Sequence, residues 1–462
     1  MNDITNNKKI NTNIDNENND NNIIKKYSNL EIITLAIGGM IGGGIFLLNG
    51  IVVNDLKQYS YISWIIGLII CLTFAFSFIL LSKEYSQLKG GTSIYPQLLF
   101  KHKYSKIIST IIIIFGYVIL TSVYSISLGS YLGKYLNQKQ YAKIYAIITI
   151  IFTLIFNYIP EKKFFYFQKI TVILKCLMFF ILILLGYFYN NQNYNDNNNI
   201  NYTIRQNNYI SKNQLSYLPI SIILLYGIST FLSYEGFEMI SNTTYKMKNP
   251  KKDIPITFIT SILIVGFIYA NLSYVTNKHL GNQIHKFKFT SLLHLTEKLP
   301  IISKYGSLFV LIICILSNIT AINSTLFTNN YIIDTFTEYN LPTNGFKHFI
   351  DTEIKLPLLS KRRKLLIWII SFISCLFVFC PILLITNLGS ILFLIIFSII
   401  SYCAIILIQN KQKKNKKIEI LNININHSIS KIICVTSILI SIIGIIYLIY
   451  QTQNMITNHT YF

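Results

Sequence analysis

Three ionisable side chains lie within apolar stretches of the sequence, where a charge is costly and usually has a function. Lys175 is near the middle of the apolar run 166–189, and Glu235 and Glu238 interrupt the run 217–241. A lysine side chain reaches only a short way along a helix, so we expect Lys175 to face other helices. Because solvation controls the protonation of a buried amine, this lysine could load and release a proton. The alternative is a structural ammonium group that donates hydrogen bonds to carbonyls of a broken neighbouring helix.

The two glutamates are about one helical turn apart, so one or both could face a binding site. A carboxylate at Glu235 beside a bound amine would favour cationic compounds such as lysine, arginine or a polyamine. The alternative is that both carboxylates are solvated in a vestibule or pair with the basic stretch 246–252.

The first apolar run, 30–50, contains five closely spaced glycines: Gly38, Gly39, Gly42, Gly43 and Gly44. Each glycine destabilises a helix by about 1 kcal/mol relative to alanine, so together they predict an unwound segment. Such a break exposes the N-terminus of the following half-helix, whose N–H groups and dipole attract an anion. A carboxylate could then approach near Ile41 and the glycines after it. The alternative is close helix packing through small residues.

The run 217–241 is interrupted in a similar way by Gly236 and its acidic neighbours. A break there would free carbonyls at Leu232, Ser233 and Glu235, which could accept hydrogen bonds from an ammonium group. Interrupted helices at corresponding positions of two halves are the best sequence pointer to a transporter binding site. Because an α-amino acid carries both a carboxylate and an ammonium group, the two breaks favour a zwitterion over a sugar or a lipid.

These residues need a membrane-spanning helical bundle to position them. The chain is 52% hydrophobic and 13% charged, whereas about 25% of residues in soluble domains are charged. A spanning helix needs about 20 mostly apolar residues. The sequence predicts about eleven such runs, at 30–50, 61–82, 106–130, 141–159, 166–189, 217–241, 254–276, 304–333, 364–380, 382–408 and 431–450.

The distribution of basic residues predicts the orientation of these runs. Lysine and arginine are concentrated in alternate loops, which places those loops and the N-terminus in the cytoplasm. Residues 1–29 are polar and Asn-rich, which predicts a disordered cytoplasmic tail. The outer polar loop 190–214, with a sequon at Asn201, and the C-terminus then lie outside. The net charge of +22 suits cationic loops beside anionic lipid better than nucleic-acid binding.

The matching breaks divide the chain into two five-helix repeats, 30–189 and 215–408. Residues 409–462 add a basic inner loop, one further helix and a polar C-terminus. The seven cysteines lie singly in apolar runs, so we expect free thiols rather than disulfides or a metal site. The sequence contains no HExxH, P-loop or GxSxG motif. We therefore predict no enzyme activity and no cofactor.

Two segments resemble motifs of the amino acid–polyamine–organocation permeases. The stretch 37–46 resembles their first-helix motif, and 231–255 resembles their sixth-helix signature. The signature contains a Gly-Phe-acid triplet followed by an Asn-Pro and a second proline, here Gly236, Phe237, Glu238, Asn249, Pro250 and Pro255. Weaker matches lie at Glu84 with its following glycine pair and at 323–342.

The resemblance implies the leucine-transporter (LeuT) fold, with ten core helices in two inverted repeats and helices one and six broken at mid-membrane. It implies alternating access to a midplane site for amino acids, polyamines or related amines, often with protons. Lys175 matches the lysine that replaces a sodium ion in proton-coupled members, and Glu238 matches the family's acid, which favours a structural or gating role. The implied substrate-binding residues are Gly38, Ile41, Gly42, Gly43, Gly44, Leu232, Ser233, Tyr234, Glu235 and Phe237.

The fold would place two further helices beside the cavity. The polar stripe of the run 106–130 comprises Tyr117, Thr121, Tyr124 and Ser125. The run 304–333 contributes Asn323 and other polar residues. Each could line or gate the cavity, or make hydrogen bonds between helices. Tyr234 and Phe237 could likewise gate the pocket or pack in an aromatic core.

The sequence departs from the family pattern at several points. Lys246 replaces the usual acid before the Asn-Pro, and Asn330 replaces a frequent arginine. The loop after the second helix is shorter, and the usual twelfth helix is absent. We predict a proton-coupled permease in the plasma membrane or an internal membrane, with a small amino acid or amine substrate, a proton and lipid as partners. The alternatives are a non-transporting sensor or subunit that retains the fold, and an exchanger or ion cotransporter.

Overall fold

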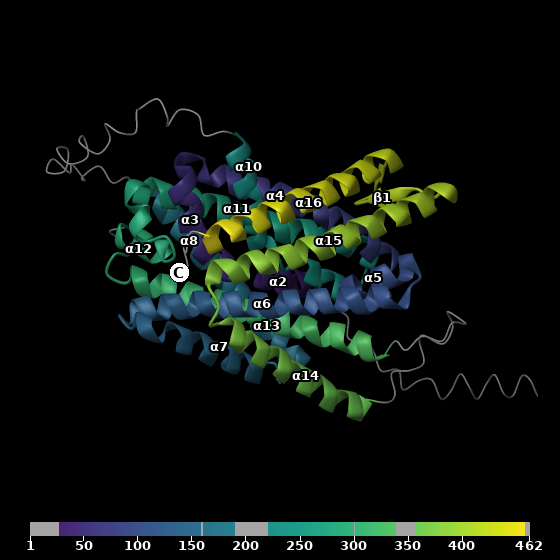
Figure 1. Cartoon of the computed structure of the whole chain (residues 1–462), viewed down its shortest axis with the longest axis horizontal. Helices are drawn as coiled ribbons and strands as arrows, with labels where there is room; N and C mark the ends of the chain where they lie inside the picture. Colours follow the sequence, from purple (N-terminus) through teal and green to yellow (C-terminus); the bar gives the residue numbers. More distant parts are fainter. Residues whose placement is uncertain (1–26, 159, 190–219, 300, 339–355, 458–462) are drawn as a thin grey trace, which may run out of the picture.

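The structure is a computed structural model that describes residues 27–158, 160–189, 220–299, 301–338 and 356–457. These residues form a helical bundle whose long helices run along the longest axis of the molecule (Figure 1). Nine helices of this part of the chain are long and apolar enough to cross a membrane. The predicted all-helical membrane architecture is therefore confirmed.

In the first half of the chain, the described residues form seven α-helices. They are α2 (Asn29–Met40), α3 (Gly43–Leu56), α4 (Ser60–Glu84), α5 (Gly91–Phe100), α6 (Lys103–Tyr135), α7 (Ala142–Phe156) and α8 (Glu161–Phe188). Short 3-10 helices, η1 (Lys57–Tyr59) and η2 (Lys139–Tyr141), connect α3 to α4 and α6 to α7.

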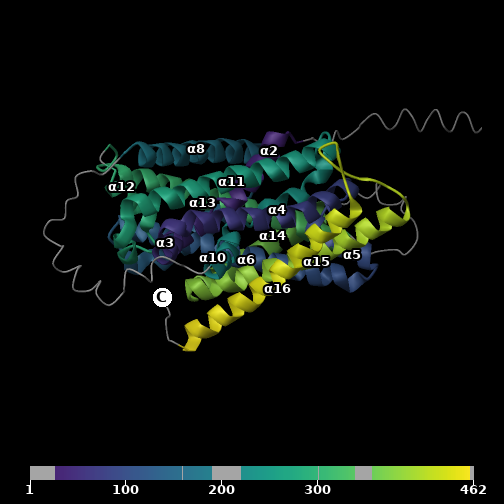
Figure 2. The ribbon, with the colours of Figure 1, turned by 90° about the horizontal axis from the view of Figure 1, so that it is seen from above.

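The second half begins with an interrupted helix and ends with a flanking pair. Its α-helices are α10 (Ile220–Phe231), α11 (Pro250–Leu280), α12 (Ser291–Glu297), α13 (Gly306–Glu338), α14 (Leu356–Phe377), α15 (Ile382–Lys413) and α16 (His427–Thr457). Its 3-10 helices are η3 (Leu232–Tyr234), η4 (Phe237–Asn242), η5 (Thr244–Lys246) and η6 (Gly281–Lys286). A hairpin of β1 (Ile418–Ile420) and β2 (Ile423–Ile425) joins α15 to α16, which lie side by side (Figure 2).

The predicted glycine-rich break in the first helix is confined to two residues. Ser28 caps the N-terminus of α2 through a capping box with Glu31, and the helix ends at Met40. Ile41 and Gly42 leave the helical conformation, and α3 begins at Gly43. The remaining glycines of the motif are helical because packing against neighbouring helices outweighs their low propensity.

The second interruption follows α10. Glu235 is extended, with φ −61° and ψ 137°, and Gly236 has φ 124°, a conformation that glycine adopts without strain. A Cβ atom at Gly236 would also lie 2.7 Å from the backbone of Gly39. The two interruptions therefore touch each other in the middle of the bundle.

The elements between the long helices differ from the predicted loops. The loop after the second helix contains α5, the outer loop before 304 contains α12, and the basic segment after α15 forms the β-hairpin. The end of the chain that we expected to be polar continues α16 to Thr457. These elements are short or amphipathic, so a search for long apolar runs overlooks them.

The number of spans remains a prediction. The nine candidates in the described residues include one continuous stretch, Gly43–Glu84, that combines two predicted runs. The predicted run 364–380 corresponds to α14, which ends before Pro381 as expected and whose described apolar part, Leu365–Phe377, is short. The whole loop 190–214 and residues 1–26 of the predicted tail 1–29 lie outside the described residues. Of the last three residues of that tail, Tyr27 is buried, Ser28 caps α2 and Asn29 begins it.

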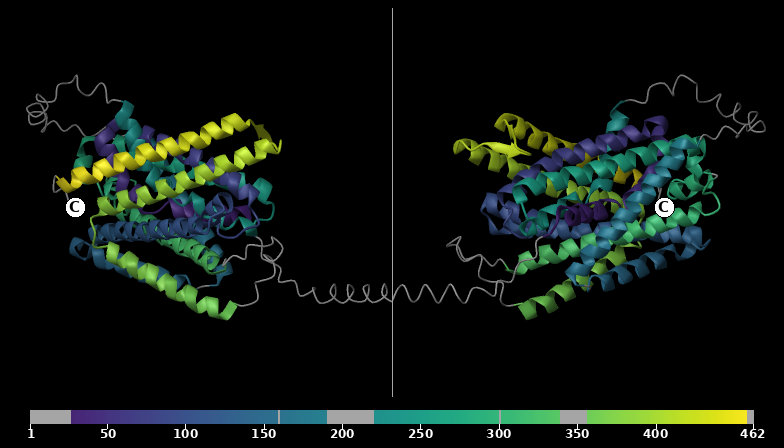
Figure 3. Two further views of the ribbon diagram at one scale, coloured as in Figure 1. Left: turned by 45° about the vertical axis from the view of Figure 1, so that its right-hand side comes forward. Right: turned by 180° about the vertical axis from the view of Figure 1, so that it is seen from behind.

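The packing places both interruptions at the centre. Helix α2 contacts α8, α11 and α13, as well as η4 after the second interruption. Two further views show α15 and α16 together on one flank of the bundle (Figure 3). This arrangement brings segments about 200 residues apart in sequence into one buried region.

Candidate functional site

Lys175 occupies the break between α2 and α3. Its side chain is fully buried, and its Nζ donates to the carbonyl of Ile41 at 2.9 Å and to Oγ1 of Thr320 at 2.8 Å. A third, longer contact of 3.5 Å reaches the carbonyl of Gly38. The ammonium group therefore satisfies backbone acceptors that the break in the helix frees. This is the structural role foreseen as an alternative; proton transfer by the same group remains a prediction.

Tyr269 of α11 links the two interruptions. Its hydroxyl lies 2.8 Å from the carbonyl of Met40 and 3.0 Å from that of Ser233. Tyr124 of α6 likewise donates to the carbonyl of Gly39 at 3.0 Å. Sequence reasoning missed Tyr269, although a tyrosine inside an apolar run was a usable signal, since its hydroxyl needs a partner.

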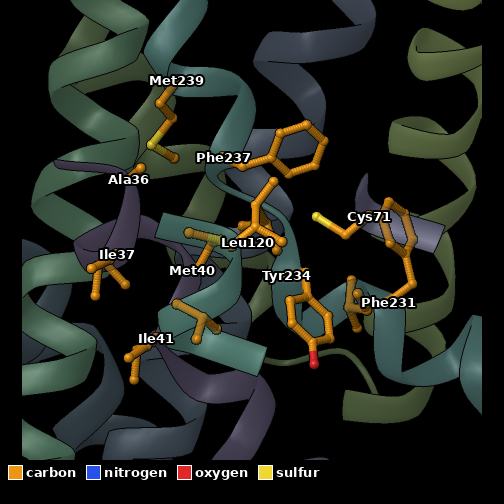
Figure 4. Packing of buried hydrophobic residues seen from close by; sticks show 14 of the residues in the cluster. Ala36, Ile37, Met40, Ile41, Cys71, Leu120, Phe231, Tyr234, Phe237 and Met239 are labelled. Carbon is orange, nitrogen blue, oxygen red and sulfur yellow. The ribbon is translucent and has the colours of Figure 1, made fainter. Parts of the chain in front are cut away.

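The glycines of the first break are closely packed. A Cβ atom at Gly42 would lie 2.7 Å from both Ala321 and Tyr124, and one at Gly44 would lie 2.5 Å from Oγ of Ser233. Figure 4 shows Met40, the last residue of α2, and Ile41, in the first break, in the same packed region as Tyr234 and Phe237 of the second. Close packing, the alternative left open by the sequence, therefore accounts for these glycines in this structure.

The N-terminus of α3 has N–H groups in its first turn that no side chain caps, a feature that suits an anion. Its N-cap is Gly42, which offers no side-chain hydrogen bond to the first turn. The N–H of Gly42 itself donates to the carbonyl of Met40 at 2.9 Å. The N–H groups of the first turn and the positive end of the helix dipole face the break. Carboxylate binding at this point remains a prediction.

The two glutamates differ sharply in their surroundings, although both are fully buried. Glu238 accepts hydrogen bonds from the hydroxyl of Tyr117 and from the N–H of Gly236, both at 2.8 Å. Neither oxygen of Glu235 has a hydrogen-bond partner among the described residues. Neither carboxylate is solvated or pairs with the basic stretch 246–252 in this part of the chain.

The carbonyls expected to receive an ammonium group are partly occupied. That of Leu232 accepts the N–H of Glu235 at 3.2 Å, and that of Ser233 accepts the hydroxyl of Tyr269. The hydroxyl of Ser233 is buried and has no partner within the described ranges. Binding of an amine here would require Tyr269 to be displaced or the amine to use other acceptors.

The remaining predicted residues mostly join helices to one another. Thr121 and Thr325 share a 3.1 Å hydrogen bond. The amide oxygen of Asn323 accepts a hydrogen bond from Asn157 at 3.2 Å, whereas its amide nitrogen finds no partner among the residues that the structure describes. Both pairs fit the alternative of interhelical hydrogen bonding.

The two aromatic candidates are core residues in this structure. The hydroxyl of Tyr234 donates to the carbonyl of Trp64 at 2.8 Å. Phe237 lies in an aromatic cluster, and both side chains point into the packed region shown in Figure 4. The rings around Phe237 are those of Phe78, Phe258 and Phe397.

Lys246, a departure from the family pattern, has an acidic partner. Its Nζ lies 3.0 Å from Oε1 of Glu161, and it contacts the hydroxyls of Tyr27 and Tyr331 at 3.3 and 3.2 Å. The N–H of Tyr27 also donates to the carbonyl of Lys246 at 2.7 Å. The cluster ties the chain before α2 to η5, α8 and α13 at one end of the bundle. We call Tyr27, Glu161, Lys246 and Tyr331 the Lys246 cluster.

No group of three or more potential metal ligands occurs in the described part of the chain. The seven cysteines are free thiols, and each is buried or half-buried. The polar groups described at the two breaks are the amine of Lys175, two carboxyl groups, hydroxyls and backbone groups.

Comparison with known proteins supports the expected relationship. The family model described as "Amino acid permease" matches residues 27–462. The inner membrane transport protein YbaT of Escherichia coli is 30% identical over 115 residues, 24% of this chain and 26% of that protein. An uncharacterised protein of Methanocaldococcus jannaschii is 33% identical over 99 residues, 21% of this chain and 22% of that protein. These matches span about a quarter of each relative.

The fold matches a solved transporter over most of its length. A Na⁺-coupled sialic acid symporter, in a substrate-bound outward-open state, superposes with a TM-score of 0.53 and 11% identity. The match covers 91% of this chain and 90% of that chain. At this identity the likeness shows the fold, which is the predicted LeuT type.

Proposed function

We propose that this chain, which belongs to the amino acid permease family, moves amino acids or related amines across a membrane by alternating access. Its family and fold are those of membrane transporters rather than enzymes. One observation carries the proposal: two interrupted helices meet in the buried centre and enclose one lysine and two glutamates. Irregular backbone and buried charges at this depth are tolerated where they serve a substrate pathway.

The two breaks offer one group for the carboxylate of an α-amino acid and another for its ammonium group. The N-terminus of α3, capped by Gly42, would receive the carboxylate. The segment Leu232 to Glu235 would receive the amine, after Tyr269 releases the carbonyl of Ser233. The candidate residues are buried, so we infer that binding accompanies movement of the half-helices.

Lys175 is the proposed proton carrier. Its protonated form has three N–H donors, and three acceptors lie at 2.8 to 3.5 Å. Loss of a proton leaves two donors, which weakens the attachment of Ile41 and Gly38 to α8. Protonation would thereby be coupled to the position of α2 relative to α3, the coupling that a proton-driven transporter needs.

The Lys246 cluster is the proposed gate at the end of the bundle near the start of α2. With the N-terminus in the cytoplasm, as the basic loops indicate, this gate would close the cytoplasmic side. Lys246, which replaces the family's usual acid, pairs with Glu161 of α8. The elements at this end of the bundle are therefore still joined by an ion pair. This contact favours a working transporter over the alternative of a sensor that only retains the fold.

The experiment is uptake by purified protein in liposomes. The panel contains labelled amino acids and polyamines, offered with and without an inward proton gradient, to wild type and to Lys175→Ala. Lys413→Ala removes an exposed lysine at the end of α15 and serves as the matched control. We expect gradient-driven uptake of at least one compound, lost in Lys175→Ala and kept in Lys413→Ala.

Other outcomes select the alternatives. Uptake that is indifferent to the gradient and to Lys175, but is stimulated by substrate on the opposite side, would identify an exchanger. Ion dependence without proton dependence would identify a cotransporter of another ion. Folded protein without flux or binding for any compound would support the sensor.

A further inference from the structure

Glu235 is a buried acid for which the described residues provide no counter-group. Its side chain is fully buried, and both carboxyl oxygens lack a hydrogen-bond partner within the described residues. A buried carboxyl group is normally hydrogen-bonded or paired, since its desolvation is otherwise uncompensated. The described residues therefore leave the position of a partner for Glu235 open to a bound ligand.

The surrounding groups confirm that no cation of the described chain is committed to Glu235. Lys175 already donates to Ile41 and Thr320, and Glu238 already accepts from Tyr117 and Gly236. The charged group that acts on Glu235 is another acid, Glu238, and no lysine or arginine of the described residues does so.

The net charge of the buried ionisable side chains at the two breaks also favours a ligand with an additional cationic group. The ionised forms of Lys175, Glu235 and Glu238, the fully buried charged side chains of the described residues at the breaks, carry a net charge of −1. A zwitterionic amino acid adds no net charge and leaves this excess in place. A second ammonium or guanidinium group on the ligand neutralises it.

We propose that Glu235 is a specificity-determining residue that binds the second cationic group of a dibasic amino acid or a diamine. This inference rests on the proposed function and names its substrate class. The ligand's carboxylate and α-amine would use the two backbone breaks. Its distal ammonium or guanidinium group would form a charge-assisted hydrogen bond with Glu235. A diamine, which has no carboxylate, would use the acceptors alone.

The test compares two ligands of almost the same shape. L-lysine and L-norleucine differ by the terminal ammonium group, so their affinity ratio isolates its contribution. Binding is measured at one pH on purified full-length protein, by competition with the labelled panel compound that gives the strongest signal. Glu235→Gln removes the charge and keeps the size, Glu235→Asp keeps the charge, and Glu419→Gln alters an exposed acid of the β-hairpin as the matched control.

We expect wild type and Glu419→Gln to prefer lysine over norleucine by at least tenfold. The preference should fall below threefold in Glu235→Gln and survive in Glu235→Asp. If Glu235→Gln does not fold, the lysine-to-norleucine affinity ratios of wild type and of Glu235→Asp test the inference instead.

Two results would overturn the inference. Equal or tighter binding of norleucine by wild type, or a lysine preference unchanged in Glu235→Gln, would show that Glu235 does not select a cation. A protonated, neutral Glu235 would give either of these results. The proposed function would still stand, because amino acids would still bind. Folded protein that neither binds nor transports any panel compound would instead refute both proposals.

Discussion

Tyr269→Phe tests whether one hydroxyl holds the two interrupted helices together. The substitution removes the hydrogen bonds to the carbonyls of Met40 and Ser233, at 2.8 and 3.0 Å, and keeps the ring. Tyr269 is fully buried, so water does not replace the lost donor. Single interhelical hydrogen bonds in membranes contribute about 0.6 kcal/mol on average and at most about 1.7 kcal/mol. Because both contacts share the single proton of the hydroxyl, they predict a loss of roughly 0.6 to 1.7 kcal/mol.

The assay is reversible unfolding of purified protein in mixed micelles, followed by tryptophan fluorescence. The ring of Trp64 lies 5.0 Å from that of Tyr269, so it reports on the region that the substitution affects. The matched control is Tyr187→Phe, which removes an exposed hydroxyl bonded to Asn271 at 2.8 Å. We expect the control to stay within about 0.5 kcal/mol of wild type.

The same variant should also alter transport. Without the hydroxyl, the carbonyl of Ser233 is free to accept an amine, so the apparent substrate affinity should change while Tyr187→Phe leaves it unaltered. A loss of less than about 0.3 kcal/mol in Tyr269→Phe, with unchanged substrate affinity, would refute the idea that this hydroxyl links the breaks. The freed carbonyls would then have found other donors.

Three further predictions concern packing, the gate and pH. Gly44→Ala should destabilise the protein by about 1 to 3 kcal/mol in the same unfolding assay, because the new methyl group would lie 2.5 Å from Ser233. Glu161→Lys should accelerate substrate leak, and the added Lys246→Glu should restore wild-type leak; the half-exposed pair contributes only about 1 kcal/mol. Burial outweighs the opposing pull of a neighbouring glutamate and lowers the pKa of His294. The contribution of His294 to the free energy of unfolding is therefore complete above about pH 6.5 and decreases as the pH falls. His294→Gln should remove this pH dependence in the same unfolding assay.

Local sequence properties determined the helices and the places where they break. Long apolar runs predicted the spans, because a bilayer requires continuous backbone hydrogen bonding. The glycine cluster and the Gly236 segment marked the two interruptions. Low helix propensity and tolerance of a positive φ are intrinsic to glycine, so they can be read from the sequence. The buried position of Lys175 also followed from the sequence, because a charge in the middle of an apolar run has to face protein.

The tertiary structure alone decided which groups pair across the bundle. Glu235 and Glu238 are alike in the sequence, yet Tyr117 of α6 reaches only Glu238. The bridge made by Tyr269 and the pairing of Lys246 with Glu161 join residues dozens to hundreds of positions apart. Hydrogen bonds between helices depend on rotation and depth within the bundle, which helical periodicity along one segment does not fix. The sequence therefore located the buried ionisable residues, and the packing of α6, α8 and α11 decided which of them lacks a partner among the described residues.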